Sequence, residues 1–221
     1  MPYAISLRAL VPGLAVVATV LQAGCSGATA CTEVPAGGTT GTAAASVGGE
    51  DVPLSEPIHA PQSITVRSDD FSDRGAMPPA LAFNGFGCTG DNRSPSLAWS
   101  GAPEATLSYA IVVHDPDAPT GVGFFHWLVY DIAPTTTSLP AGGSTALAAG
   151  AVDGRSDFGS TGYGGPCPPH GSGQHRYVFT VYALDVASLG LPAEGSGGAM
   201  LRFMLAQHTL GFGRIIGTFE R

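Results

Sequence analysis

The residues that could do chemistry gather in three short segments, each beside an apolar run. One of them is the acidic turn DPDAP, from Asp115 to Pro119, which directly follows the apolar run 108–114. Because two prolines restrict its backbone, the carboxylates of Asp115 and Asp117 are held in place. Taken alone, such a segment is most simply a turn in which the aspartates bond to their own backbone.

Histidines mark the other two segments. His126 lies inside the apolar run 124–130, where a single histidine is more often a core residue than a ligand. His175 precedes Arg176 and Tyr177 at the start of another apolar run. If Arg176 is buried it needs a carboxylate partner, and the acidic turn offers two, which would be a purely structural role.

Composition argues against one class of partner and offers no motif for catalysis. The 221-residue chain has a formal net charge of −8, and all nine of its basic residues are arginine. Nucleic-acid binding needs clustered positive charge, so this partner is not expected. The sequence contains no G-x-S-x-G nucleophile elbow and no HExxH or CxxC metal motif. We therefore predict a protein that is not an enzyme and that holds no metal or cofactor.

The elements that must position these residues are mostly strands. The high content of glycine and proline, 32 and 18 residues, favours an all-β domain rich in turns. A single amphipathic run late in the chain, 196–208, predicts a helix. Separate strands joined by loops, with one late helix, predict an antiparallel β-sandwich. The predicted strands are 63–67, 97–99, 108–114, 124–130, 176–184 and 214–219.

The first 61 residues predict export of the chain. Residues 1–24 contain an apolar run of signal-peptide length. Cys25 follows small residues as in a bacterial lipobox, so we predict that it is lipidated, although Gln22 stands where that pattern prefers an aliphatic residue. The alternatives are a plain secretory signal, which would leave the protein secreted or periplasmic, and a retained anchor. Residues 25–61 predict a flexible tether to the membrane, and 62–221 the folded domain.

Several motifs in the folded part occur together in one order. They are FNG at 83–85, GDN at 90–92, SP at 94–95, DPDAP at 115–119, HWLV at 126–129, GRSDFGSTGYGGPCPP at 154–169 and HRYVFTVYALD at 175–185. With this order and spacing, residues from about Ile64 to Phe219 resemble the phosphatidylethanolamine-binding proteins, which include the Raf kinase inhibitor proteins. The similarity is strongest to the bacterial YbhB/YbcL-type branch of that family.

The resemblance implies a fold and a site. The fold is a mainly β, antiparallel β-sandwich of Greek-key type with a short C-terminal helix. The site is a small anion pocket for phosphate or a phospholipid headgroup, where imidazoles and backbone N–H groups can donate hydrogen bonds. Pro166 stands where relatives often have an N–H, which leaves the amide of Cys167 as a donor. Carried over by position, the ligand-binding residues are Asp115, Asp117, His126, Gly165, Cys167, Pro168, His175 and Tyr177.

The cysteines offer one covalent constraint. An exported protein meets oxidising conditions, so we predict a disulfide between Cys88 and Cys167, with two buried free thiols as the alternative. It would close a loop of roughly 80 residues and contribute about 4 kcal/mol by restricting the unfolded chain. Cys31, in the tether, is expected to be unpaired.

Two functions remain open from the sequence. The first is a non-enzymatic anion-binding protein of the cell envelope. The alternative, which the resemblance implies, is an interaction or inhibitor protein that acts on a kinase or protease partner. The sequence contains no patch that identifies such a partner.

Overall fold

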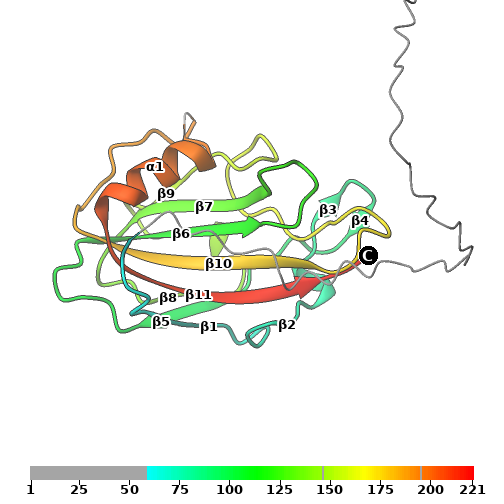
Figure 1. The fold of residues 1–221 in the computed structure, drawn as a ribbon, viewed down its shortest axis with the longest axis horizontal. Helices are drawn as coiled ribbons and strands as arrows, with labels where there is room; N and C mark the ends of the chain where they lie inside the picture. The colour runs from blue at the N-terminus through cyan, green and yellow to red at the C-terminus, as the bar shows by residue number, and fades with distance from the viewer. Residues whose placement is uncertain (1–58, 146, 195) are drawn as a thin grey trace, which may run out of the picture. The chain divides into compact units, whose positions relative to one another are not determined.

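Two sheets and one helix form three layers in the computed structural model, which describes residues 59–145, 147–194 and 196–221. Figure 1 shows the helix α1 above the large sheet and the small sheet below it. The large sheet has the order β2-β11-β10-β6-β7-β9 and the small sheet β1-β5-β8, while β3 and β4 form a separate hairpin. All pairings are antiparallel except that of β2 with β11.

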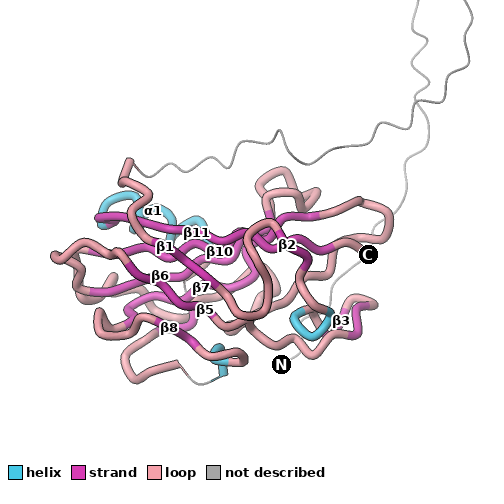
Figure 2. The backbone as a smooth tube through the Cα atoms, turned by 90° about the horizontal axis from the view of Figure 1, so that it is seen from below, coloured by secondary structure: helices cyan, strands magenta, loops and turns pink. Residues whose placement is uncertain are grey.

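The strands and helices have the following bounds. The strands are β1 (Thr65–Arg67), β2 (Gly75–Ala76), β3 (Asn84–Gly85), β4 (Cys88–Thr89), β5 (Leu97–Ser100), β6 (Ser108–Asp115), β7 (Phe124–Ile132), β8 (Ser138–Leu139), β9 (Val152–Asp153), β10 (His175–Leu184) and β11 (Thr209–Phe219). The helix α1 spans Gly198–His208, and short 3₁₀ turns span Pro79–Leu81 and Gly143–Thr145. Loops and turns make up much of the remaining chain, as Figure 2 shows.

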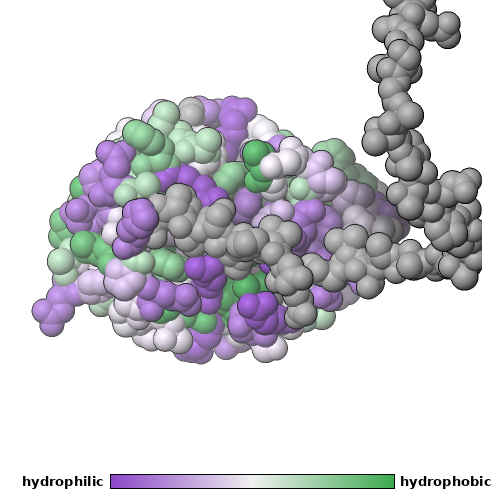
Figure 3. All heavy atoms as spheres, viewed as in Figure 1, coloured by the Kyte–Doolittle hydropathy of each residue, from purple (hydrophilic) through white to green (hydrophobic). Residues whose placement is uncertain are grey.

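The central strands are apolar on both faces because both faces of the large sheet are covered. Ile111 and Val113 of β6 belong to the core shared with the small sheet, whereas Ala110 and Val112 belong to the core shared with α1. Alternate residues of a strand point to opposite faces, so a sheet packed on both sides needs this unbroken apolar pattern. On the outside, the face drawn in Figure 3 mixes polar and apolar residues, as is normal for a protein surface.

The predicted fold class is confirmed, and the differences lie at the element ends. The helix begins at Gly198, two residues later than predicted. The last strand begins at Thr209 rather than at residue 214, directly after the helix, because its first residues pair with the far end of β10. Five strands of two residues each, β2, β3, β4, β8 and β9, were not predicted, since so short a run carries no periodic signal.

The predicted signal peptide, Cys25, Cys31 and nearly all of the tether lie outside the described residues. Within the residues that the structure describes, no helix is long and apolar enough to cross a membrane.

Candidate functional site

Three of the predicted residues come from one face of two neighbouring strands. β10 and β6 are antiparallel with Val178 opposite His114, so the next pair along is Tyr177 with Asp115. Tyr177 belongs to the core between the two sheets. Because strand residues alternate between faces, His175 points to the same side as Tyr177. The site therefore begins where the core of the sandwich ends.

His126 reaches this side through a β-bulge in β7. Val113 of β6 pairs with Trp127 of β7, but the next residue, His114, pairs with Phe125. His126 is therefore an extra residue in β7 without a partner in β6. Bulges increase the local twist and re-aim side chains beside functional sites. The bulge turns His126 away from the helix side of the sheet, on which Phe125 packs.

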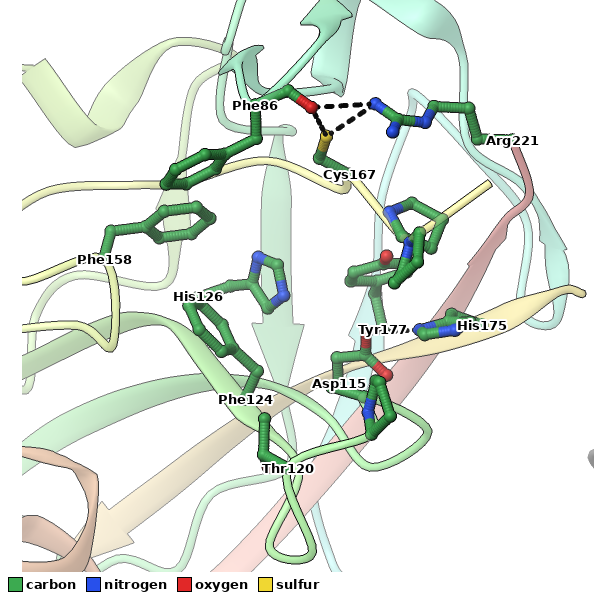
Figure 4. Close-up of a pocket in the computed structure, with 14 residues that line it drawn as sticks. Phe86, Asp115, Thr120, Phe124, His126, Phe158, Cys167, His175, Tyr177 and Arg221 are labelled. Carbon is green, nitrogen blue, oxygen red and sulfur yellow. Dashed lines mark hydrogen bonds and ion pairs between the residues drawn. The ribbon is translucent and has the colours of Figure 1, made fainter. Parts of the chain in front are cut away.

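These side chains line a pocket of about 330 Å³ (Figure 4). Six of the eight residues predicted for ligand binding are among those that line it. The complete lining is Phe86, Asp115, Ala118, Pro119, Thr120, Phe124, His126, Phe158, Cys167, Pro168, Pro169, His175, Tyr177 and Arg221.

A hydrogen-bonded chain fixes one wall of the pocket. Asp115 Oδ2 lies 2.7 Å from Nδ1 of His175, and both side chains are almost fully buried, at 4% and 3% exposed. His175 Nε2 lies 2.9 Å from Ser172 Oγ, whose hydroxyl donates to the carbonyl of Pro169 at 2.8 Å. The other oxygen of Asp115 accepts the backbone N–H of Asp117 at 2.8 Å.

This chain has the connectivity of a Ser-His-Asp triad but not its proton arrangement. The Ser172 hydroxyl already donates to Pro169, so His175 must donate its own Nε2–H to the serine. Burial alone would lower the pKa of His175, but the hydrogen bond and charge of Asp115 outweigh it and raise that pKa. In this geometry both ring nitrogens of His175 act as donors, Nδ1–H to Asp115 and Nε2–H to Ser172, so the ring is an imidazolium that cannot take a proton from Ser172. The geometry fixes the loop and places a buried cation beside the pocket.

His126 has the opposite electrostatic character. Its Nδ1–H donates to the carbonyl of Gly164 at 2.8 Å, which leaves Nε2 as the ring nitrogen available to the pocket. Burial lowers the pKa of His126, and this effect outweighs the carbonyl and the charge of Asp115, which act to raise it. At neutral pH the ring is uncharged, so Nε2 accepts hydrogen bonds and becomes a donor only when it takes up a proton.

Tyr177 supplies a buried hydroxyl that is poorly satisfied. The residue is 1% exposed, and its Oη makes no hydrogen bond of good geometry among the described residues, although the Asp115 carboxylate is near enough to act on it as an acceptor. Burial, together with the neighbouring charge of Asp115, raises the pKa of Tyr177 well above its usual range, so the phenol keeps its proton. A buried O–H without an acceptor is unfavourable, and an acceptor that enters the pocket would satisfy it.

Two predicted ligand contacts are not part of the pocket lining. The carboxylate of Asp117 is occupied by Arg176, whose Nε and Nη2 donate to it at 2.8 and 2.6 Å. The N–H of Gly165 donates to Asn92 Oδ1 at 2.7 Å. A side chain at position 165 would collide with the Leu81 carbonyl, 2.0 Å from an ideal Cβ. Asp117 and Gly165 thus hold the loops in place, and the structural role considered for Arg176 is the one observed.

The structure joins Cys88 to Cys167 by a disulfide across a sequence separation of 79. The bond ties the β3–β4 hairpin to the proline-rich loop that forms the pocket wall. Arg221, which the sequence analysis did not select, lies against it: Nη1 donates to the Phe86 carbonyl at 3.2 Å and lies 2.9 and 3.2 Å from the two sulfurs. Figure 4 shows this contact at the edge of the pocket.

The sequence analysis also missed the aromatic part of the lining, Phe86, Phe124 and Phe158. A usable signal was the aromatic residue between two glycines at positions 85–87, an unusual choice for a turn. No group of three or more metal-ligating side chains is present in the described part of the chain. With His175 protonated, the side chains of the lining carry the positive charges of His175 and Arg221 and the negative charge of Asp115, which sum to +1.

Comparison with known proteins gives a consistent result. A family model described as phosphatidylethanolamine-binding protein matches residues 67–220. UPF0098 protein YbcL of Escherichia coli is 43% identical over 159 residues, which are 70% of this chain and 86% of the relative. Lipoprotein LppC of Mycobacterium tuberculosis is 39% identical over 174 residues, 76% of this chain and 78% of the relative. The crystal structure of E. coli YbcL superposes with a TM-score of 0.70 at 42% identity, covering 72% of this chain and 99% of that one.

Proposed function

Since this chain belongs to the phosphatidylethanolamine-binding protein family, we propose that it is a non-catalytic binding protein whose pocket takes a small anion, namely a phosphate group, free or as a monoester headgroup. Proteins of this family generally bind ligands rather than transform them. The hydroxyl of Tyr177 is the observation that carries the proposal, because it is a buried donor that makes no hydrogen bond of good geometry among the described residues. An anion oxygen in the pocket would be a better-placed acceptor than the Asp115 carboxylate beside it.

The charges of the pocket support an anionic ligand despite the carboxylate in its wall. Asp115 is neutralised by the imidazolium of His175, with which it shares a 2.7 Å contact. Arg221 then leaves an excess of one positive charge. The Asp117–Arg176 pair beside the pocket is balanced within itself. A monoanion would therefore complete the charge of the site, and desolvation by the buried walls strengthens each such interaction.

The proposal extends to the cellular location. We expect export, with lipidation of Cys25 and a tether of residues 25–61 that holds the domain away from the membrane. A relative named as a lipoprotein, LppC, supports this expectation. Labelling of cells with radioactive palmitate tests it: the wild-type chain should become labelled and Cys25→Ser should not. Equal labelling of both chains, or of neither, would contradict it.

Chemical-shift mapping tests the binding proposal. Inorganic phosphate added to the ¹⁵N-labelled chain should perturb the amides of Cys167 and Tyr177 in a saturable manner. A second hollow, lined by Arg67, Ser96 and Ser138, also has a cation and polar groups, and it serves as an internal comparison. Perturbations that cluster there, or that do not saturate, would refute the site assignment.

A further inference from the structure

Phe86 stands where a turn would normally place a small residue. It forms with Gly87 the two-residue connection between β3 and β4, with φ of 51° and 81° at the two positions. Positive φ at both positions is the pattern of a type I′ turn, which strongly favours asparagine, aspartate and glycine. An aromatic residue in this backbone region is strained, and strain of this kind clusters at functional sites.

Burial does not compensate for that strain. The Phe86 side chain is 76% exposed, yet it lines the pocket. The hairpin that bears it is held from three sides. The Cys88–Cys167 disulfide ties down its second strand, the Phe83 N–H donates to the Pro166 carbonyl at 3.0 Å, and Arg221 donates to the carbonyl of Phe86 itself. The ring is thus presented at the pocket by a rigid support.

Phe86 belongs to a group of aromatic rings with nearly parallel faces. Its ring centroid lies 6.2 Å from that of Phe158 at an interplanar angle of 16°, and 5.6 Å from that of Phe83 at 25°. Phe83 and Phe158 are stacked at 4.4 Å. Phe124 meets Phe158 edge-on at 4.9 Å. We call Phe83, Phe86, Phe124 and Phe158 the aromatic wall; all but Phe83 line the pocket.

The pocket is divided into a polar and an apolar side. Figure 4 shows Tyr177, Asp115 and His175 on one side and Phe86 and Phe158 on the other, with the His126 ring between them. A bare inorganic anion would occupy only the polar side. A ligand that fills the pocket must combine an anionic group with an apolar group a few ångströms away.

We infer that the ligand of this pocket is an anion that carries an aromatic ring, with its phosphate at Tyr177 and His126 and its ring against Phe86 and Phe158. The nearly parallel faces of Phe86 and Phe158 favour a flat partner, since stacked rings gain energy beyond the area they bury. A flexible alkyl chain buries area but loses rotamer freedom on binding. This inference rests on the proposed function and specifies its ligand class.

Three phosphate monoesters that differ only in the esterified group distinguish an aromatic ligand from a lipid-like one. Calorimetry of the full chain with phenyl, n-hexyl and methyl phosphate should give an affinity for phenyl phosphate about 10-fold higher than for methyl phosphate, the order expected for one aromatic contact. n-Hexyl phosphate should fall between them. If n-hexyl phosphate binds as tightly as phenyl phosphate or more tightly, the aromatic assignment is overturned in favour of a lipid-like ligand.

Phe86→Asn is the informative variant because asparagine suits the positive φ of the turn, so the hairpin should fold at least as well as in the wild type. It should reduce the preference for phenyl over methyl phosphate to about threefold or less. Phe203→Ala is the matched control, since Phe203 is 64% exposed on α1, which contributes no residue to the pocket. It should keep the 10-fold preference.

The outcomes distinguish this inference from the proposed function. If inorganic phosphate binds but phenyl and methyl phosphate bind equally well, the aromatic assignment fails while the anion pocket stands. If Phe86→Asn retains the full preference, Phe86 is not its source and the inference is overturned. If neither phosphate nor any ester binds, both proposals fail.

Discussion

Replacing Tyr177 by phenylalanine should lower the affinity for phosphate without lowering the free energy of unfolding. The substitution removes one oxygen and leaves the buried ring in place. The hydroxyl makes no hydrogen bond of good geometry among the described residues, so the folded protein loses little internal bonding. A buried unsatisfied polar group costs about 1–3 kcal/mol. We therefore expect the free energy of unfolding of Tyr177→Phe to be unchanged or higher by about 1 kcal/mol.

Anion affinity should change in the opposite direction. A hydrogen bond to a charged group contributes about 1.5–3 kcal/mol, which corresponds to a roughly 10- to 100-fold loss of phosphate affinity when the donor is removed. Urea denaturation and calorimetric titration of the same preparation measure the two quantities.

Tyr163→Phe is the matched control for this experiment. Tyr163 is also buried, but its hydroxyl donates to the Leu81 carbonyl at 3.2 Å, and the residue does not line the pocket. Its replacement should lower the free energy of unfolding by about 1 kcal/mol and leave phosphate affinity intact. The reasoning is refuted if Tyr177→Phe binds phosphate as tightly as the wild type, or if both variants lose affinity equally.

Three further outcomes follow from the charges and the disulfide. Sulfate keeps its charge over the whole pH range of the titration, and it should bind more tightly as the pH falls from 7 toward the lowered pKa of His126, because the bound anion favours the protonated ring. In calorimetric titrations, His126→Gln should abolish this pH dependence of sulfate affinity. Asp117→Asn should destabilise the fold by about 3 kcal/mol at pH 7, because buried Arg176 loses its carboxylate. The pKa of Asp117 is lowered in the folded state by Arg176, against the effect of burial, so its contribution is present above the ordinary carboxyl pKa of 3.8 and is lost as the pH falls through the lowered value. In urea denaturation, the difference in the free energy of unfolding between Asp117→Asn and the wild type should therefore become smaller in strong acid. A difference that does not depend on pH would contradict the ion-pair assignment. The double variant Cys88→Ser/Cys167→Ser should have a free energy of unfolding about 4 kcal/mol lower than that of the oxidised wild type. If urea denaturation gives the same free energy of unfolding for the two proteins, the disulfide contributes nothing to stability.

The sequence could predict most of the fold because the main strands carry strong patterns. The runs that became β6, β7 and β10 are apolar on both faces, which correctly indicated central strands of a covered sheet. Asp115, His175 and Tyr177 were also accessible to prediction, since they occupy the ends of such strands. Their arrangement on one face follows from strand alternation once the register is known.

The remaining part of the site depends on geometry that no periodic pattern encodes. Strict alternation would place His126 on the same face as Leu128, which packs toward the helix, and only the bulge redirects it. The tautomer of its ring is fixed by the Gly164 carbonyl, 38 residues away. Arg221 comes from a segment with no motif of its own, and it meets Phe86 only through the fold.

The central claim is that an anion binds between Tyr177 and His126. A crystal structure of the full chain with arsenate, an anomalously scattering analogue of phosphate, tests this most directly. We expect an anomalous peak in the pocket, with an arsenate oxygen within hydrogen-bond distance of Tyr177 Oη and another facing Nε2 of His126. An empty pocket at saturating arsenate, or arsenate bound only elsewhere on the protein, would contradict it.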